Sequence, residues 1–300
     1  MVQNIELILD SAVRLALPLI FAVLGEWIAE RAGTLNISVE AMMLGAAFSA
    51  VMGAELTGSA SLGLLFGIAA GLLVAFIHAT FSHRLSVNTY VVGLTLNVLV
   101  LGLTSYLLTE TTSRQVDRLT WGPLAELPII GPVLFDEYWP AYLLIVLIPL
   151  CAWLVHRSRW GLEARAAGEN PQSADVTGID VNKRRRQALL ICGALAGLGG
   201  AYLSVAVVGS FNTNMTAGRG FIVIAAVIFG GWTLRGAIAG CLLFGAADAL
   251  RLALPAMGFE INAQLLIASP YLLALIAMTF FAKSHRGPRA LGTPFVRGIT

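Results

Sequence analysis

Long apolar segments separated by short polar connections run along the whole chain of 300 residues. A helix that crosses a bilayer needs roughly 20 mostly apolar residues. By that measure the pattern predicts about nine crossings, within a range of about eight to ten. The predicted crossings are 11–28, 37–54, 61–81, 88–109, 139–156, 187–208, 220–233, 236–254 and 263–282. The expected fold is therefore an all-α, polytopic bundle of transmembrane helices that forms one domain, 1–300.

Two of these segments are irregular. The stretch 220–233 is too short for a straight crossing, and polar residues interrupt the pattern near 34–45. Paired short or interrupted segments, one in each half of a chain, are the best sequence pointer to a transport site in a membrane protein. We therefore expect broken or short helices at both places.

Composition excludes a water-soluble globule. Hydrophobic residues make up 57% of the chain and charged residues only 12%, and the mean hydropathy is +0.81. Soluble domains have about 25% charged residues and under about 50% apolar ones. The net charge of +2 gives no reason to expect a nucleic-acid partner. The three cysteines, Cys151, Cys192 and Cys241, lie far apart in apolar segments, so we expect buried thiols and no metal site.

Basic residues predict the orientation, because Lys and Arg collect on the cytoplasmic side of membrane proteins. They gather in the loop 157–186 and in the tail 283–300, at Arg157, Arg159, Arg165, Lys183, Arg184, Arg185, Arg186, Lys283, Arg286, Arg289 and Arg297. Four predicted crossings separate the two regions, which is an even number, as two cytoplasmic regions require. Counting backward places the connection 110–138 and the N-terminus outside and the C-terminus in the cytoplasm.

Several polar residues at membrane depth are candidates for lining a translocation path. Asn36 and Glu40 are four positions apart and would share one face of a helix. A carboxylate at that depth is costly unless it is paired or faces water, so a structural pair and a polar path both stay open. The full candidate set is Asn36, Glu40, Asn88, Asn97, Asn212, Asn214 and Arg219.

Some polar residues favour packing instead. For Asn88 and Asn97, hydrogen bonding between helices is the favoured alternative to a place in the path. Asp248 and Arg251 are three apart and are expected to pair with each other. Small residues at a spacing of four predict close helix contacts at Gly67/Gly71, Gly193/Gly197 and Gly236/Gly240.

The loop 157–186 contains more than the basic residues that orientation requires. Helix formers at 161–167 are followed by a break at 168–171 and a second short helical stretch that ends near Gly178. Short helices outside the membrane offer a docking surface for a soluble partner, but a solvated linker is the alternative. The chain has no GxxxxGK[ST], HExxH or GxSxG motif, so we expect neither an ATPase site nor an enzyme active site, and no cofactor.

Residues 30–45, ERAGTLNISVEAMMLG, resemble the ERAGxxNIxxEGMML signature of bacterial ABC importer permeases of the branched-chain amino acid and simple sugar superfamily. The wording is most similar to the nucleoside-type branch, which works with a basic-membrane-protein-type binding lipoprotein. The resemblance continues through 160–171, 178–181, 215–222 and 225–230, and so covers nearly the whole chain. Ala41 stands where the signature usually has Gly, and it keeps a small residue there.

The resemblance implies the second, shorter permease chain of a heterodimer in the bacterial cytoplasmic (inner) membrane, as one permease domain. A cytoplasmic ATPase would use ATP and Mg²⁺, and an extracytoplasmic binding lipoprotein would deliver a nucleoside or nucleobase. The loop 157–186 would be the coupling loop, which favours docking over a linker. Its coupling residues would be Glu163, Arg165, Gly168, Glu169, Asn170 and Gly178.

Three other functions are weighed against this one. The same machinery would serve a simple sugar or a branched-chain amino acid. An ion-coupled secondary transporter acting alone would use Glu40 or Asp248 as its proton carrier. An intramembrane enzyme would need a facing catalytic pair, and the sequence offers no suitable one.

Overall fold

The computed structural model describes residues 2–108, 117–120, 136–256 and 287–298, with the single positions 262, 264, 265, 268 and 272. Within these ranges, seven helices are long and apolar enough to cross a membrane. They match seven of the predicted crossings. The segment 220–233 forms only a short helix, α10 (Arg219–Phe229), and most of 263–282 lies outside the described residues. The all-α membrane bundle is confirmed, and the count of nine crossings stays a prediction.

Seven helices form these crossings, and one of them, α6, is preceded by a 3-10 turn. They are α1 (Val2–Arg31), α2 (Val39–Thr57), α3 (Ala60–His83), α4 (Thr89–Tyr106), α6 (Leu143–Arg157, after the turn η2, Trp139–Tyr142), α9 (Val181–Tyr202, continued by the π-helix η3, Leu203–Val208) and α11 (Leu234–Ala256). Two short helices, α7 (Arg159–Glu169) and α8 (Pro171–Val176), follow α6.

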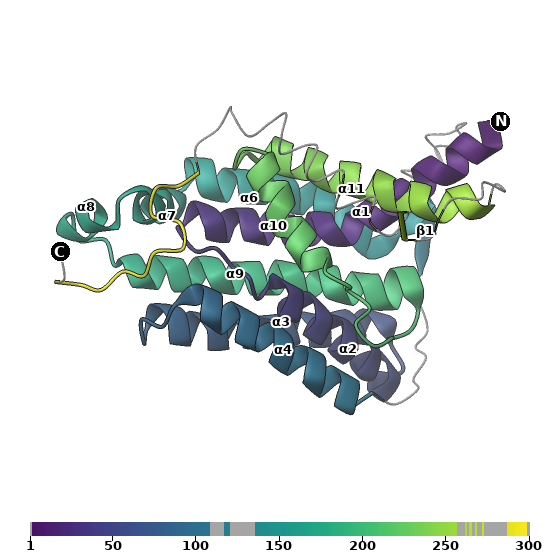
Figure 1. Ribbon diagram of the computed structural model, residues 1–300, viewed down its shortest axis with the longest axis horizontal. Helices are drawn as coiled ribbons and strands as arrows, with labels where there is room; N and C mark the ends of the chain where they lie inside the picture. The colour runs from purple at the N-terminus through teal and green to yellow at the C-terminus, as the bar shows by residue number, and fades with distance from the viewer. Residues whose placement is uncertain are drawn as a thin grey trace.

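Helix α9 is the central helix, with α1 on one side and α2 and α3 on the other (Figure 1). Its glycines allow the close approach that their spacing predicted. A Cβ atom on Gly71 of α3 would lie 2.3 Å from the carbonyl oxygen of Gly193 and 2.7 Å from Cα of Gly197. Near the other end of the chain, Gly236 contacts Gly230 in the same way. Small residues thus set the spacing between backbones in both places.

The two ends of the bundle differ. Helices α7 and α8 and the tail 287–298 lie at one end, and the beginning of α1 lies at the other, beside strand β1 (Arg118–Thr120) (Figure 1). Strand β1 pairs antiparallel with β2 (Asp136–Tyr138), a small ribbon that the sequence pattern did not predict. Glu137 in β2 is buried and accepts a hydrogen bond from Nε of Arg14 at 3.0 Å. Burial raises the pKa of Glu137, although the Arg14 guanidinium opposes the shift.

Candidate functional site

A non-helical stretch, 32–38, separates α1 from α2 deep in the bundle. Backbone groups away from water need partners, and here side chains supply them. Asn36 donates its backbone N–H to Oε1 of Glu26 at 3.0 Å. Asn97 of α4 donates from Nδ2 to the carbonyl oxygen of Ile37 at 2.9 Å and accepts the N–H of Ala41 at 2.9 Å. The predicted break near 34–45 is therefore present. Asn97 forms hydrogen bonds between α4 and this stretch, which is the role that the sequence favoured for it.

The expectation that Asn36 and Glu40 share a helix face is wrong. Helix α2 begins only at Val39, because the backbone of Asn36 is held by Glu26 instead of by a helical carbonyl. The Asn36 side chain is fully buried, accepts the Ser38 hydroxyl at 2.7 Å and points its Nδ2 at Sγ of Cys192, 3.2 Å away. Ser38 also bonds to Nδ1 of His78 at 2.6 Å. In this conformation Asn36 stabilises the break.

A second non-helical stretch, 209–218, lies between η3 and α10. Gly209 ends η3 with a left-handed φ of 76°. Asn214 and Ala217 also have positive φ, at 55° and 44°, which is uncommon for residues other than glycine. Phe211 is buried and packs edge-on against Phe48 of α2, with 5.3 Å between ring centroids. The chain thus turns back toward α2 before α10 begins.

Glu40 joins the two broken stretches. Its Oε1 accepts the Thr216 hydroxyl at 2.5 Å and the N–H of Gly218 at 2.9 Å, and its Oε2 accepts the N–H of Gly220 at 2.6 Å. The first N–H groups of a helix lack helical partners and lie at the positive end of its dipole, so a carboxylate is favoured there. A Cβ atom on Gly220 would lie 2.5 Å from the backbone nitrogen of Glu40. Glu40 therefore caps α10 from α2.

Arg219, the first residue of α10, is tied to α11. Its Nη2 donates to Oδ2 of Asp248 at 3.0 Å, and Nη1 donates to the carbonyl oxygen of Met215 at 3.0 Å. Nε of Arg251 donates to the other oxygen of Asp248 at 2.9 Å, which confirms the expected pair. Asp248 therefore has two cationic partners.

The structure brings together four of the seven path candidates at these two broken stretches, namely Asn36, Glu40, Asn97 and Arg219. Asn212 and Asn214 belong to the second stretch, but their side chains are exposed. Asn88 lies elsewhere, at the beginning of α4, where its side chain accepts the N–H of Tyr90 at 2.9 Å. A role in the path stays a prediction for all seven.

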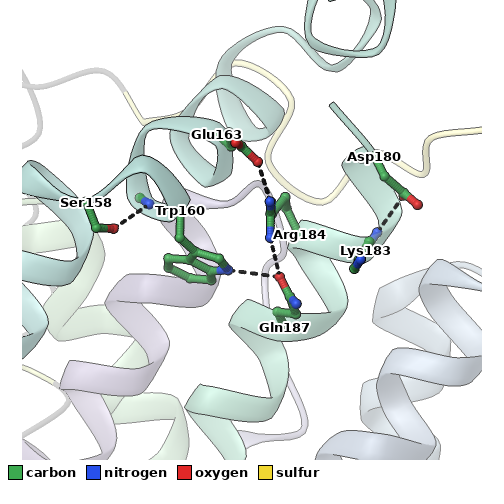
Figure 2. A network of polar contacts seen from close by, with 8 residues as sticks. Ser158, Trp160, Glu163, Asp180, Lys183, Arg184 and Gln187 are labelled. Atoms are coloured by element: carbon green, nitrogen blue, oxygen red, sulfur yellow. Dashed lines mark hydrogen bonds and ion pairs between the residues drawn. The ribbon is translucent and has the colours of Figure 1, made fainter. Parts of the chain in front are cut away.

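The loop 157–186 contains the two helices that its pattern predicted. Ser158 caps α7 by accepting the N–H of Gly161 at 2.9 Å, and Asn170 caps α8 by accepting the N–H of Ser173 at 2.9 Å. Figure 2 shows how α7 is held against α9: Nε of Arg184 donates to Oε2 of Glu163 at 2.6 Å. We call α7, α8 and the tail 287–298 the platform.

Gln187 of α9, next to this ion pair, holds α7 by further hydrogen bonds. Oε1 of Gln187 accepts both Nη1 of Arg184 and the indole N–H of Trp160, each at 2.9 Å (Figure 2). Because Trp160 belongs to α7 and the other two residues to α9, the two helices share one hydrogen-bonded network.

The six predicted coupling residues differ in exposure. Glu163 and Arg165 are half-buried, Glu169, Asn170 and Gly178 are exposed, and Gly168 is buried. A Cβ atom on Gly168 would lie 2.3 Å from the carbonyl oxygen of Arg31, so Gly168 lets α7 touch the end of α1.

Two exposed apolar side chains on the platform were not among the predicted site residues. Leu162 of α7 is 62% exposed and Val176 of α8 is 88% exposed. Both side chains lie on the two short helices that the loop pattern predicted, but the sequence pattern alone did not single them out.

The structural role of Arg185 was not predicted, because the sequence analysis used this residue only as a basic residue that indicates orientation. Its side chain is fully buried. Nε donates to the carbonyl oxygen of Ala32 at 3.3 Å, Nη2 to that of Ala167 at 3.2 Å, and Nη1 to that of Thr293 at 2.6 Å. One guanidinium thus joins the end of α1, the end of α7 and the tail.

Backbone contacts strengthen the same joint. Ala290 donates its N–H to the carbonyl oxygen of Gly168 at 2.9 Å, and Gly292 donates to that of Gly33 at 3.0 Å. The Phe295 side chain is buried beside Ala167 and α8. The tail is therefore part of the platform and connects it to the first crossing helix.

The described residues contain no group of three or more His, Cys, Asp or Glu side chains that could hold a metal ion. All three cysteines are buried and free. The polar groups of the two broken stretches are bonded mainly to one another and to backbone. These contacts tie α2 to α4 and to α10.

Comparison with known proteins agrees with this architecture. The sequence family described as "branched-chain amino acid transport system / permease component" matches residues 8–282. A guanosine ABC transporter permease protein of Bacillus subtilis is 32% identical, over 99% of this chain and 98% of its own length. A nucleoside ABC transporter permease protein of Lactococcus lactis is also 32% identical, with the same two coverages. A putative glucose ABC transporter permease protein of Haloferax volcanii is 36% identical over 82% of this chain and 77% of its own length. This chain belongs to the permease-component family of branched-chain amino acid transport systems, and it is a multi-pass membrane permease subunit.

Proposed function

We propose that this permease carries nucleosides or nucleobases as one membrane subunit of an ATP-driven importer in the bacterial inner membrane. The observation that carries the substrate assignment is the end-to-end similarity to two permeases named for guanosine and nucleoside transport. Nucleobases and ribose are neutral and polar, so amide and hydroxyl groups suit the path better than free charges. Among the path candidates, Asn212 and Asn214 have exposed amides.

The platform is the proposed contact with a cytoplasmic ATPase, which would bind ATP and Mg²⁺ itself. Leu162, Glu169 and Val176 are exposed on it and would touch the ATPase. Gly168 and Arg185 would transmit the movement, because both contact the end of α1. A second permease chain would complete the pore, and an extracytoplasmic lipoprotein would deliver the substrate. With the platform in the cytoplasm, the beginning of α1 would face outside.

Movement at the platform would reach the broken stretches through rigid contacts. Helix α1 packs along α9, and α9 packs along α2 and α3. Glu40 then links α2 to the first turn of α10. We propose that these tied helices rock together when the ATPase closes, so that the polar path changes sides without any chemistry on the substrate.

A specific observation supports one second candidate, the same machinery with a sugar substrate. The permease of Haloferax volcanii that is 36% identical is named as a putative glucose permease. An ion-coupled transporter has less support, because both residues named as proton carriers are engaged. Glu40 accepts three hydrogen bonds and Asp248 pairs with two arginines.

The test is uptake of radiolabelled guanosine in cells that lack this gene and in cells that have it restored. We expect restored uptake that unlabelled nucleosides suppress and that glucose and leucine do not. Leu162→Asp should abolish uptake at an unchanged membrane level, whereas Leu162→Met should preserve it. Suppression by glucose would reassign the substrate. Uptake that collapses with an uncoupler at normal ATP would overturn the ATP-driven mechanism.

A further inference from the structure

A pocket of about 230 Å³ lies between the end of α3 and the beginning of α9, at the same end of the bundle as the platform. Thr80 of α3 and Arg84, the residue after that helix, line one side, and Lys183, Arg186 and Gln187 line it from α9. Phe76 of α3 forms its apolar wall. The pocket is separate from both broken stretches and from the exposed residues of the platform.

The polar part of the pocket is strongly cationic. Three of its side chains, Arg84, Lys183 and Arg186, carry positive charge, and none of the described residues that line it is acidic. None of the three forms an ion pair within the part of the chain that the structure describes. The Nε atom of Arg186 is buried and has no hydrogen-bond partner there.

The neighbouring charged groups do not neutralise the pocket. Arg184 is already engaged with Glu163 on α7. Asp180 accepts the backbone N–H of Lys183 as the cap of α9. Nε2 of His83 is hydrogen-bonded to the Thr34 hydroxyl at 2.9 Å. Neither nearby carboxylate, Glu163 or Asp180, forms an ion pair with the three pocket cations within the described residues.

The other wall of the pocket is apolar and faces outward from the bundle. Phe76 lines the pocket and is 60% exposed, and Leu73, three residues before it on α3 and outside the pocket lining, is also 60% exposed. Exposed apolar side chains on a crossing helix face lipid. Because Arg84 and Lys183 lie at helix ends, the pocket changes from apolar to cationic at the depth where lipid headgroups lie.

We propose that this pocket binds an anionic phospholipid. Its phosphate would sit between Arg84, Lys183 and Arg186, with Nε of Arg186 donating to a phosphate oxygen, and its acyl chain would lie along Phe76 and Leu73. A free phosphate would use only the cations and would leave the apolar wall without a ligand. Basic pockets between crossing helices are favourable sites for acidic headgroups.

Native mass spectrometry of the purified full-length protein tests the proposal, with phosphatidylglycerol and phosphatidylcholine as probes. We expect the protein to retain phosphatidylglycerol in preference to phosphatidylcholine. Each cation near a headgroup contributes about fivefold in affinity, so the double variant Lys183→Gln/Arg186→Gln should bind phosphatidylglycerol roughly 25-fold more weakly. Arg186→Lys keeps the charge and should retain most of the binding, which separates lost recognition from misfolding.

The matched control is Arg159→Gln/Arg235→Gln, which removes the same charge from two exposed residues outside the pocket. It should bind phosphatidylglycerol like the unchanged protein. An equal loss in the control would overturn the pocket in favour of diffuse attraction. Equal retention of phosphatidylcholine, or full competition by inorganic phosphate, would overturn the lipid assignment. Exclusion of lipid once partner subunits are bound would assign the surface to a protein contact.

Discussion

The carboxylate of Glu40 at the beginning of α2 accepts the backbone N–H of Gly220, 2.6 Å away, in the first turn of α10. The two residues lie far apart in sequence, one beside each broken stretch. A short helix that begins inside the bundle needs an anchor at its first turn, and this carboxylate is the anchor.

Glu40→Gln should detach α10. An amide keeps one oxygen but turns an NH₂ group toward a backbone donor, so at least one N–H loses its acceptor. Leaving a buried donor without a partner costs about 1–3 kcal/mol. We expect a lower melting temperature in detergent and loss of uptake. Thr216→Val removes one donor only and should have the smaller effect on both. Equal melting temperatures for Glu40→Gln and the unchanged protein would contradict the anchor.

Gly71→Ala should force α3 away from α9. Its methyl group would lie 2.3 Å from the carbonyl oxygen of Gly193, which is backbone and cannot turn aside. Overpacking of this kind costs about 1–3 kcal/mol. The control is Gly102→Ala in α4, where a Cβ atom meets nothing within 4 Å. Thermal unfolding followed by thiol reactivity of the buried cysteines should show early exposure in the first variant and not in the second.

The crossings and the glycine contacts were predictable because both depend on local patterns. Twenty apolar residues specify a membrane helix, and small residues four apart specify a close contact. The position of Asn36 was not predictable in this way. The backbone N–H of Asn36 is bound by Glu26, and its side chain lies beside Cys192. Contacts between elements that are distant in sequence leave no spacing pattern from which they could be predicted.

Arg185 shows the same limit. It belongs to the run of four basic residues 183–186, and the sequence pattern predicts the same thing for each of them, a charge on the cytoplasmic side. The helical rotation of α9 separates them: Arg184 pairs with Glu163, Arg185 is fully buried, and Arg186 faces the cationic pocket. The two short helices of the loop 157–186 were predictable because they and the break between them are local features, whereas the tail that completes the platform is distant in sequence.

Arg185→Gln should release the tail from the platform. The shorter neutral side chain cannot reach carbonyl oxygens on three segments, and the loss of about 2 kcal/mol would raise the detached population roughly 30-fold. Limited proteolysis of the protein in detergent should then cleave within 287–298 much faster. Arg235→Gln, which removes an exposed charge, should leave the cleavage rate unchanged. Equal cleavage rates in the two variants would show that the backbone contacts alone hold the tail.

Gly168→Ala and Glu169→Ala should both abolish uptake, but for different reasons. Gly168 is buried against Arg31, so its replacement should lower the melting temperature by displacing α7. Glu169 is exposed, so its replacement should remove the proposed contact with the ATPase. The free energy of unfolding should stay within about 0.5 kcal/mol of that of the unchanged protein, and the melting temperature should hardly move. Copurification with the ATPase and melting curves, measured on both variants, separate the two. Normal uptake by Glu169→Ala would remove that residue from the docking surface.

The contact between Gly292 and Gly33 also has a consequence for biogenesis. The ribosome makes Gly33 with the first crossing helix, long before it makes the tail. Until residues 287–298 emerge, the carbonyl groups at the end of α1 and α7 and the guanidinium of Arg185 lack part of their partners. A chain interrupted before that point would insert its earlier helices, but its platform would lack the tail 287–298. On the proposed function, a chain without its tail would therefore offer the ATPase an incomplete platform.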